Sequence, residues 1–63
     1  MFLRMVKFIN AYNSPEELFD YANVIENKFK KDEVTEDEMR TLLSMCFQKA
    51  IMIAILERNG VNV

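Results

Sequence analysis

The sequence predicts an all-α fold, a short three-helix domain that pairs into a dimeric helical bundle. Apolar residues recur at helical spacing along most of the 63 residues, and a single glycine and a single proline are too few for a many-turned β fold. In the segment Met45 to Leu56, MCFQKAIMIAIL, ten of twelve residues are apolar. A helix apolar on nearly every side needs cover on every side. We therefore expect one domain over residues 1–63, with a second chain completing its core.

The first predicted helix covers about residues 2–12. Its apolar side chains follow the i, i+3, i+4, i+7 pattern of one helix face; they are Phe2, Met5, Val6, Ile9 and Tyr12. Arg4 and Lys7 fall away from this face. A β-strand over the same residues would break its alternation at Val6 and would have no strand with which to pair.

The second predicted helix covers about residues 15–30, and its start is marked by Ser14-Pro15-Glu16-Glu17. Serine suits the N-cap, proline the first helical position, and Glu17 can complete a capping box. The expected inward face consists of Leu18, Ala22, Ile25 and Phe29, with Phe19 and Tyr21 at its edges.

Three lysines, Lys28, Lys30 and Lys31, lie where this second helix ends. They form a possible basic partner patch, which could contact phosphate or another protein. The alternative is that they are the cations often found at the negative end of a helix dipole.

The third predicted helix covers about residues 36–59, because Thr35 and Glu38 form a second capping box and Gly60 supplies a C-terminal stop. It is preceded by an acidic segment, with five carboxylates between Asp32 and Glu38. That segment lacks the central glycine and alternating ligands of a calcium loop. We predict no metal site there.

Two apolar faces are expected on the third helix. The inward face continues through Met39, Leu42, Leu43, Cys46, Ala50, Ile53 and Ala54, and Phe47 and Ile51 widen it on one side. The side expected to face water carries the predicted dimer or partner interface, which comprises Met45, Lys49, Met52, Ile55 and Leu56. Five methionines also suit an adaptable interface. The alternative is that these residues fill the core of a small domain.

The composition argues against an enzyme and against a bound cofactor. No histidine is available as a general base, and the only cysteine, Cys46, lies on an apolar face where burial makes a thiol inert. A protein-built zinc site needs about four nitrogen or sulfur ligands, which this chain cannot supply. The formal charge of −2 gives no support to a protein that coats nucleic acid.

We expect a cytoplasmic protein without a transmembrane segment. The amino terminus, MFLRMVKFIN, lacks the continuous apolar core and cleavage site of a signal peptide. The twelve-residue apolar segment is shorter than the roughly 20 residues that cross a bilayer.

Two short motifs resemble the Hha/YmoA family of small regulators. The run from Val24 to Phe29, VIENKF, is similar to that family's VIE-(K)NK-aromatic run. The run from Thr35 to Met39, TEDEM, followed by Ser44, is similar to its Ser-acid-x-Glu-Leu helix start. The resemblance covers roughly residues 17–50. It implies an all-helical protein that binds nucleoid-associated DNA-binding proteins, although Phe47-Gln48-Lys49 replaces the family's Asp-His-Arg run.

The sequence thus predicts a small, non-enzymatic protein-interaction module, a homodimeric regulator, adaptor or inhibitor of a larger protein. Its size suits a protein encoded by a phage or another mobile element. One alternative is a transcription or nucleoid-associated modulator that acts with DNA or with a DNA-binding partner. Another is peripheral attachment to a membrane through the apolar first helix.

Overall fold

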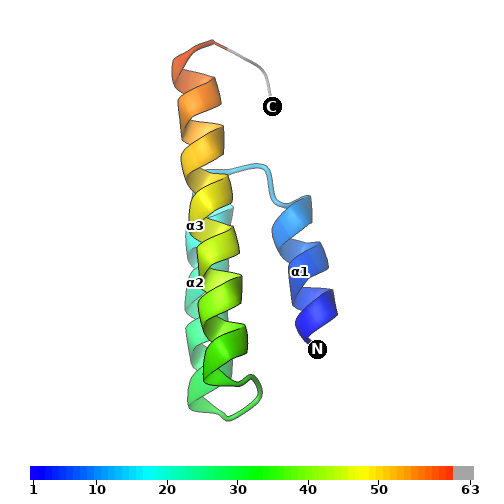
Figure 1. Ribbon diagram of the computed structural model, residues 1–63. Helices are drawn as coiled ribbons and strands as arrows, with labels where there is room; N and C mark the ends of the chain where they lie inside the picture. The colour runs from blue at the N-terminus through cyan, green and yellow to red at the C-terminus, as the bar shows by residue number, and fades with distance from the viewer. Residues whose placement is uncertain (61–63) are drawn as a thin grey trace.

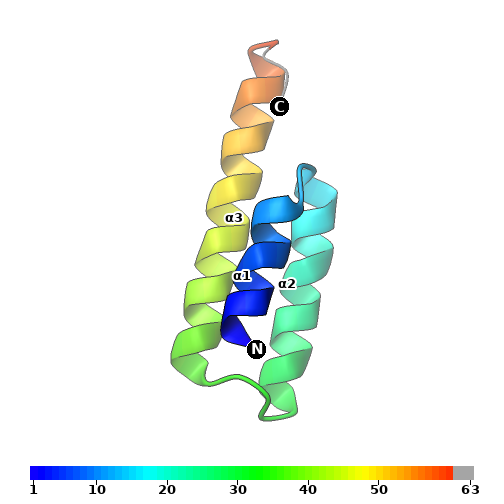
Figure 2. The same ribbon diagram turned by 90° about the vertical axis from the view of Figure 1, so that its right-hand side faces the viewer.

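The computed structural model describes residues 1–60 and contains the three helices α1 (Phe2–Ala11), α2 (Pro15–Lys30) and α3 (Glu36–Arg58). Figures 1 and 2 show α2 and α3 side by side as a helical hairpin, with α1 packed against them. The predicted all-α, three-helix fold is confirmed, and the predicted helix ends agree to within one residue. Residues 61–63 of the predicted domain lie outside the described residues.

The core lies where the three helices meet. Its buried side chains come from α1, α2, α3 and the loop before α3; they are Met5, Ile9, Leu18, Tyr21, Ala22, Ile25, Val34, Leu42, Cys46, Ala50 and Ile53. Within residues 1–60 no polar or charged residue is buried. Tyr21 adds a hydroxyl group to this core, and within the described residues no buried side-chain nitrogen or oxygen atom lacks a hydrogen-bond partner.

Two predicted core positions are wrong in detail on α2. Phe29 was expected inward but is 36% exposed, whereas Tyr21, expected at the edge, is only 8% exposed. Phe29 lies in the last turn of α2, and at this closed end of the hairpin the core is completed by Val34 from the connecting loop. The Tyr21 ring packs against Tyr12, with ring centroids 5.4 Å apart.

The two predicted capping boxes have different outcomes. At the start of α3, the Glu38 amide donates to Thr35 Oγ1 at 3.1 Å, and the Thr35 amide donates to Glu38 Oε1 at 2.8 Å. This capping box is confirmed. Ser14 occupies the N-cap of α2 but makes no side-chain capping bond. The start of α2 depends instead on Pro15 and on two acidic residues that face the positive end of the helix dipole.

The end of α2 is closed by backbone hydrogen bonds of the Schellman type. The Asp32 amide donates to the Phe29 carbonyl at 3.0 Å, and the Glu33 amide donates to the Lys28 carbonyl at 2.8 Å. Asp32 has a φ of 59°, the left-handed conformation that glycine adopts with least cost. Asp32 is thus a strained residue in an otherwise regular turn.

The three helices differ in length, and this difference shapes the molecule. α2 has 16 residues and α3 has 23. Figures 1 and 2 show the carboxyl-terminal part of α3 extending past the ends of α1 and α2. The described chain is correspondingly elongated, with extents of 40 × 16 × 16 Å. Ala54, predicted to face inward, is exposed, although the preceding residue, Ile53, is buried.

Candidate interaction surface on helix α3

The main candidate site is an apolar surface on the carboxyl-terminal third of α3, which we call the tail patch and define as Ile51, Met52, Ile55 and Leu56. Ile51 is 59% exposed, Met52 62% and Ile55 49%, and Leu56 is half-buried. With Gln48 these side chains line a shallow depression of about 280 Å³. Single exposed apolar residues are common, but a continuous group of them marks a binding surface.

The tail patch arises from a change of residue type along one side of α3. The buried residues of α3, Leu42, Cys46, Ala50 and Ile53, define its inward face. At about 100° per residue, Ser44 and Ile55 both point away from that face. The outward side is polar in the first half of the helix, at Arg40, Thr41 and Ser44, and apolar in the tail patch.

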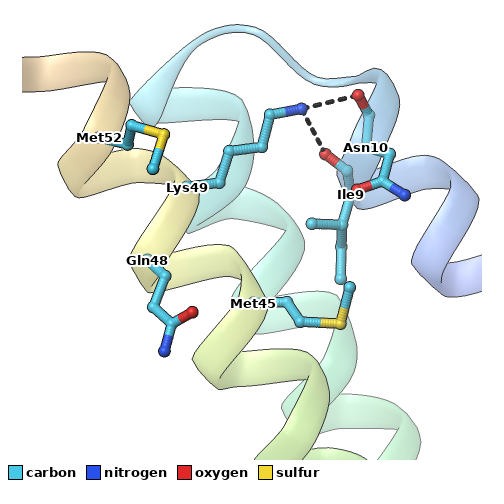
Figure 3. Close-up of a pocket in the computed structure, with 6 residues that line it drawn as sticks. All are labelled: Ile9, Asn10, Met45, Gln48, Lys49 and Met52. Carbon is cyan, nitrogen blue, oxygen red and sulfur yellow. Dashed lines mark hydrogen bonds between the residues drawn. The ribbon is translucent and has the colours of Figure 1, made fainter. Parts of the chain in front are cut away.

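A second groove, between the end of α1 and α3, adjoins the tail patch. It has a volume of about 270 Å³, and Figure 3 shows its lining residues, Ile9, Asn10, Met45, Gln48, Lys49 and Met52. Gln48 and Met52 belong to both depressions. The tail patch and this α1–α3 groove therefore form one continuous surface.

Lys49 ties α1 to α3 across the floor of the groove (Figure 3). Its ammonium group donates to the carbonyl of Ile9 at 3.0 Å and to that of Asn10 at 2.7 Å. Carbonyls in the last turn of a helix lack partners within the helix, and α1 has no basic residue in its own last turn. Lys49 therefore serves as a distant C-terminal cap for α1.

The five predicted interface residues thus have different environments. Met52 and Ile55 are exposed and Leu56 is half-buried in the tail patch. Met45 is half-buried and packs against the core, and the charged end of Lys49 points toward α1. Their participation in an interface stays a prediction, and it rests most directly on the exposed residues.

Two exposed apolar side chains were assigned to the inward face of α3. Ile51 is 59% exposed and Phe47 43%, although both were expected to widen the buried face. The Phe47 ring lies beside the half-exposed ring of Phe19 on α2, with centroids 6.1 Å apart. Helix spacing places Phe47 at the edge of the buried face and Ile51 farther out, about 100° from Ala50. The predicted lengths of the second and third helices were the signal that part of this edge would lack cover.

The lysines at the end of α2 do not form a uniform basic surface. Lys28 is half-buried, and its ammonium group lies 4.0 Å from Glu33 Oε2. Lys30 and Lys31 are exposed, but Asp32 and Glu33 follow them directly. The positive charge of this patch is therefore partly offset by neighbouring carboxylates.

Burial shifts the pKa of two side chains in the core, Cys46 and Tyr21. Cys46 is fully buried, and burial raises the pKa of its thiol, which disfavours the reactive thiolate. Burial also raises the pKa of Tyr21, with smaller contributions from Tyr12 and Cys46. Residues 1–60 contain no group of three or more potential ligands that could hold a metal ion. The predictions of no enzymatic activity and no cofactor stay predictions.

By length and composition alone, α3 could cross a membrane. Its most apolar 18-residue window has a mean hydropathy of 1.4, and only 22% of that window is buried. The sequence prediction considered only the twelve-residue apolar segment from Met45 to Leu56, which is too short to cross a bilayer. A spanning α3 would carry Lys49 into the hydrocarbon layer, at a cost of about 3 kcal/mol near its centre, and would lose the cap on α1. The prediction that no segment crosses a membrane stays a prediction.

Fold and surface together define a small all-α protein in which one helix end exposes a continuous apolar patch. No protein-family model, no curated protein and no solved structure matches the chain. The resemblance to the Hha/YmoA family accordingly rests on its two short motifs alone.

Proposed function

We propose that the chain is a non-enzymatic protein-interaction module and that it forms a homodimer through the tail patch. One observation carries this proposal: Ile51, Met52 and Ile55 are each about half exposed or more, on one side of a single helix. Apolar surface of this kind is stabilised when it leaves water, by about 25 cal/mol per Å². A chain of 63 residues also has a thin core, and oligomerisation is a common means of stabilising such a domain.

The available area supports self-association. Phe47, Ile51, Met52 and Ile55 are between 43% and 62% exposed. At about 150–250 Å² for a large side chain, they offer roughly 400 Å² of apolar surface. A stable interface needs about 800 Å² from each partner. Phe47 and the three most exposed residues of the tail patch together therefore supply about half of a standard interface, and the rest must come from the surface around them.

A dimer formed in this way would leave most of α1 and α2 free. We propose that these outer surfaces, which carry Arg4, Lys7, Lys30 and Lys31, are available to a larger protein for which the dimer is a regulator, adaptor or inhibitor. The two copies would then present each surface twice, which raises the avidity for a partner with two matching sites.

The test is the solution mass of the chain, measured by light scattering over a concentration series. The natural chain should have twice the monomer mass. Met52→Asp should remain helical but become a monomer, because it places a charge in the proposed interface. Ser44→Asp, on the same outward side but in the polar half of α3, should remain a dimer.

Ile53→Asp is the control for folding. Ile53 is only 5% exposed, so a charge at this position is buried without a partner and should unfold the chain. A natural chain that is a folded monomer at every concentration would overturn the proposal. So would a Met52→Asp variant that keeps the dimer mass.

A further inference from the structure

We infer that two copies pair antiparallel, with Met52 beside the two-fold axis and with each tail patch closing the partner's α1–α3 groove. This inference rests on the proposed dimer and adds its orientation and its full extent. Three features of the structure lead to it: the width of the exposed apolar arc, the position of the groove and the distribution of charge along α3.

The exposed apolar arc is too wide for one neighbouring helix. Five apolar residues at this end of α3 are exposed or half-buried; in their order around the helix they are Ala54, Ile51, Ile55, Met52 and Leu56. At about 100° per residue they span roughly 200° of the helix surface. A helix that packs against one neighbour needs an apolar stripe of about 100°. The tail of α3 therefore needs more than one neighbouring element, and a pair centred on Met52 covers the part of this arc between Ile55 and Leu56.

The partner offers two such elements side by side. Its own tail patch lies on α3, and its α1–α3 groove begins at the shared residues Gln48 and Met52. A helix laid along the partner's tail patch would continue into this groove, between the end of α1 and Met45. One side of the incoming tail then contacts α3, and another contacts the end of α1. The groove adds contact surface beside that of the tail patch.

Charge decides the orientation. The first turn of α3 is acidic, with Glu36, Asp37 and Glu38, and the preceding loop adds Asp32 and Glu33. A parallel pair would place these carboxylates beside those of the partner. An antiparallel pair crossing at Met52 places them at opposite ends of the dimer, separated by far more than the Debye length of about 8 Å. It also leaves the polar side chains of Arg40, Thr41 and Ser44 in water.

Antiparallel packing makes a specific prediction about which residues face each other. Gln48, Met52 and Leu56 lie in one row, because residues four apart are neighbours on a helix surface. If Met52 lies beside the two-fold axis, it faces Met52 of the second copy, and Gln48 faces Leu56 of that copy. In a parallel pair each of the three residues would instead face its own equivalent.

The experiment uses single cysteines in the full chain under mild oxidation, with one copy tagged so that mixed dimers can be separated by mass. Cys46 remains in place, because its thiol is fully buried, and the natural chain serves as the uncross-linked control. Met52→Cys should form a disulfide-linked homodimer. Gln48→Cys and Leu56→Cys should each cross-link weakly alone but efficiently with each other. Ser44→Cys, the matched exposed position in the polar half, should cross-link roughly tenfold less than Met52→Cys.

The outcomes separate the orientation from the proposed dimer. Equal self-linkage at positions 48, 52 and 56 would show a parallel pair, which overturns this inference and leaves the homodimer intact. A dimer by light scattering without preferential linkage at Met52 would place the interface elsewhere and overturn the use of the tail patch. A monomer in solution that sediments with phospholipid vesicles would overturn both, because lipid would then be the cover of the tail.

Discussion

Lys49 gives the sharpest test of how the three helices hold together. Its ammonium group makes two charge-assisted bonds, of 3.0 Å and 2.7 Å, to the last-turn carbonyls of α1. Losing a hydrogen bond to a charged group costs about 1.5–3 kcal/mol, and losing a cation from a helix end costs about 0.3–1 kcal/mol. Since water can replace Lys49 at the exposed Asn10 carbonyl, we expect Lys49→Met to destabilise the docking of α1 by about 1–2 kcal/mol.

Amide hydrogen exchange measures this change helix by helix. Because about 1.4 kcal/mol corresponds to a factor of ten, the amides of α1 should exchange roughly tenfold faster in Lys49→Met. The amides of α2 and α3 should change less, because α1 can open while the hairpin remains folded. Lys7→Met removes the same charge from an exposed position on α1 and serves as the control. Equal exchange in the two variants would refute the role of Lys49 as a cap for α1.

Three further predictions concern the helix ends and the core. Thr35→Ala should lower the free energy of unfolding by about 1 kcal/mol, whereas Ser14→Ala should cost less, because only Thr35 makes a side-chain capping bond; urea unfolding of both variants checks this. Asp32→Gly should raise the free energy of unfolding by about 1 kcal/mol, because glycine relieves the left-handed conformation at this position. The contribution of the buried Cys46 thiol to the free energy of unfolding should be complete below the thiol pKa of the unfolded chain, about 8.5. It should fall as the pH rises above that value. Burial raises the folded pKa of Cys46, so the unfolded chain loses its thiol proton first. Urea titrations at about pH 7 and about pH 9.5 should show a smaller loss for Cys46→Ala than for the natural chain.

The helices themselves could be predicted because their ends are marked by local chemistry. Each of these signals acts on the backbone within one turn, so the sequence alone indicates where a helix begins or ends. Pro15 marks the start of α2, Thr35 with Glu38 the start of α3, and Gly60 its end. The buried face of α1 could be predicted for a similar reason. Met5 and Ile9 follow helical spacing, and both are almost completely buried.

The positions that could not be predicted depend on contacts between distant segments. Lys49 caps a helix that lies about forty residues earlier in the chain, and no local pattern reports such a contact. Val34 enters the core from a loop, where periodicity gives no guidance. Phe47 lies at the edge of the buried face of α3, beside Phe19 of α2, and spacing alone could not distinguish a covered edge from an exposed one. Ile51 lies about 100° from Ala50, so its exposure could have been predicted from the helical spacing.

The apolar end of α3 is exposed for two separate reasons: α3 is longer than α2, and some of its apolar residues point away from the other two helices. α3 is seven residues longer than α2, with 23 residues against 16, or about 10 Å at 1.5 Å per residue. A longer α2 would cover Ala54, which lies near the α2 side of the helix. It would not cover Ile55, which points away from the buried face of α3, or Met52, which is turned well away from it. Ile55 faces a side of α3 that neither α1 nor α2 covers, and Met52 lies at the rim of the groove between the end of α1 and α3. An element from outside the three helices is needed to cover them, and a second copy brings a surface of the same composition.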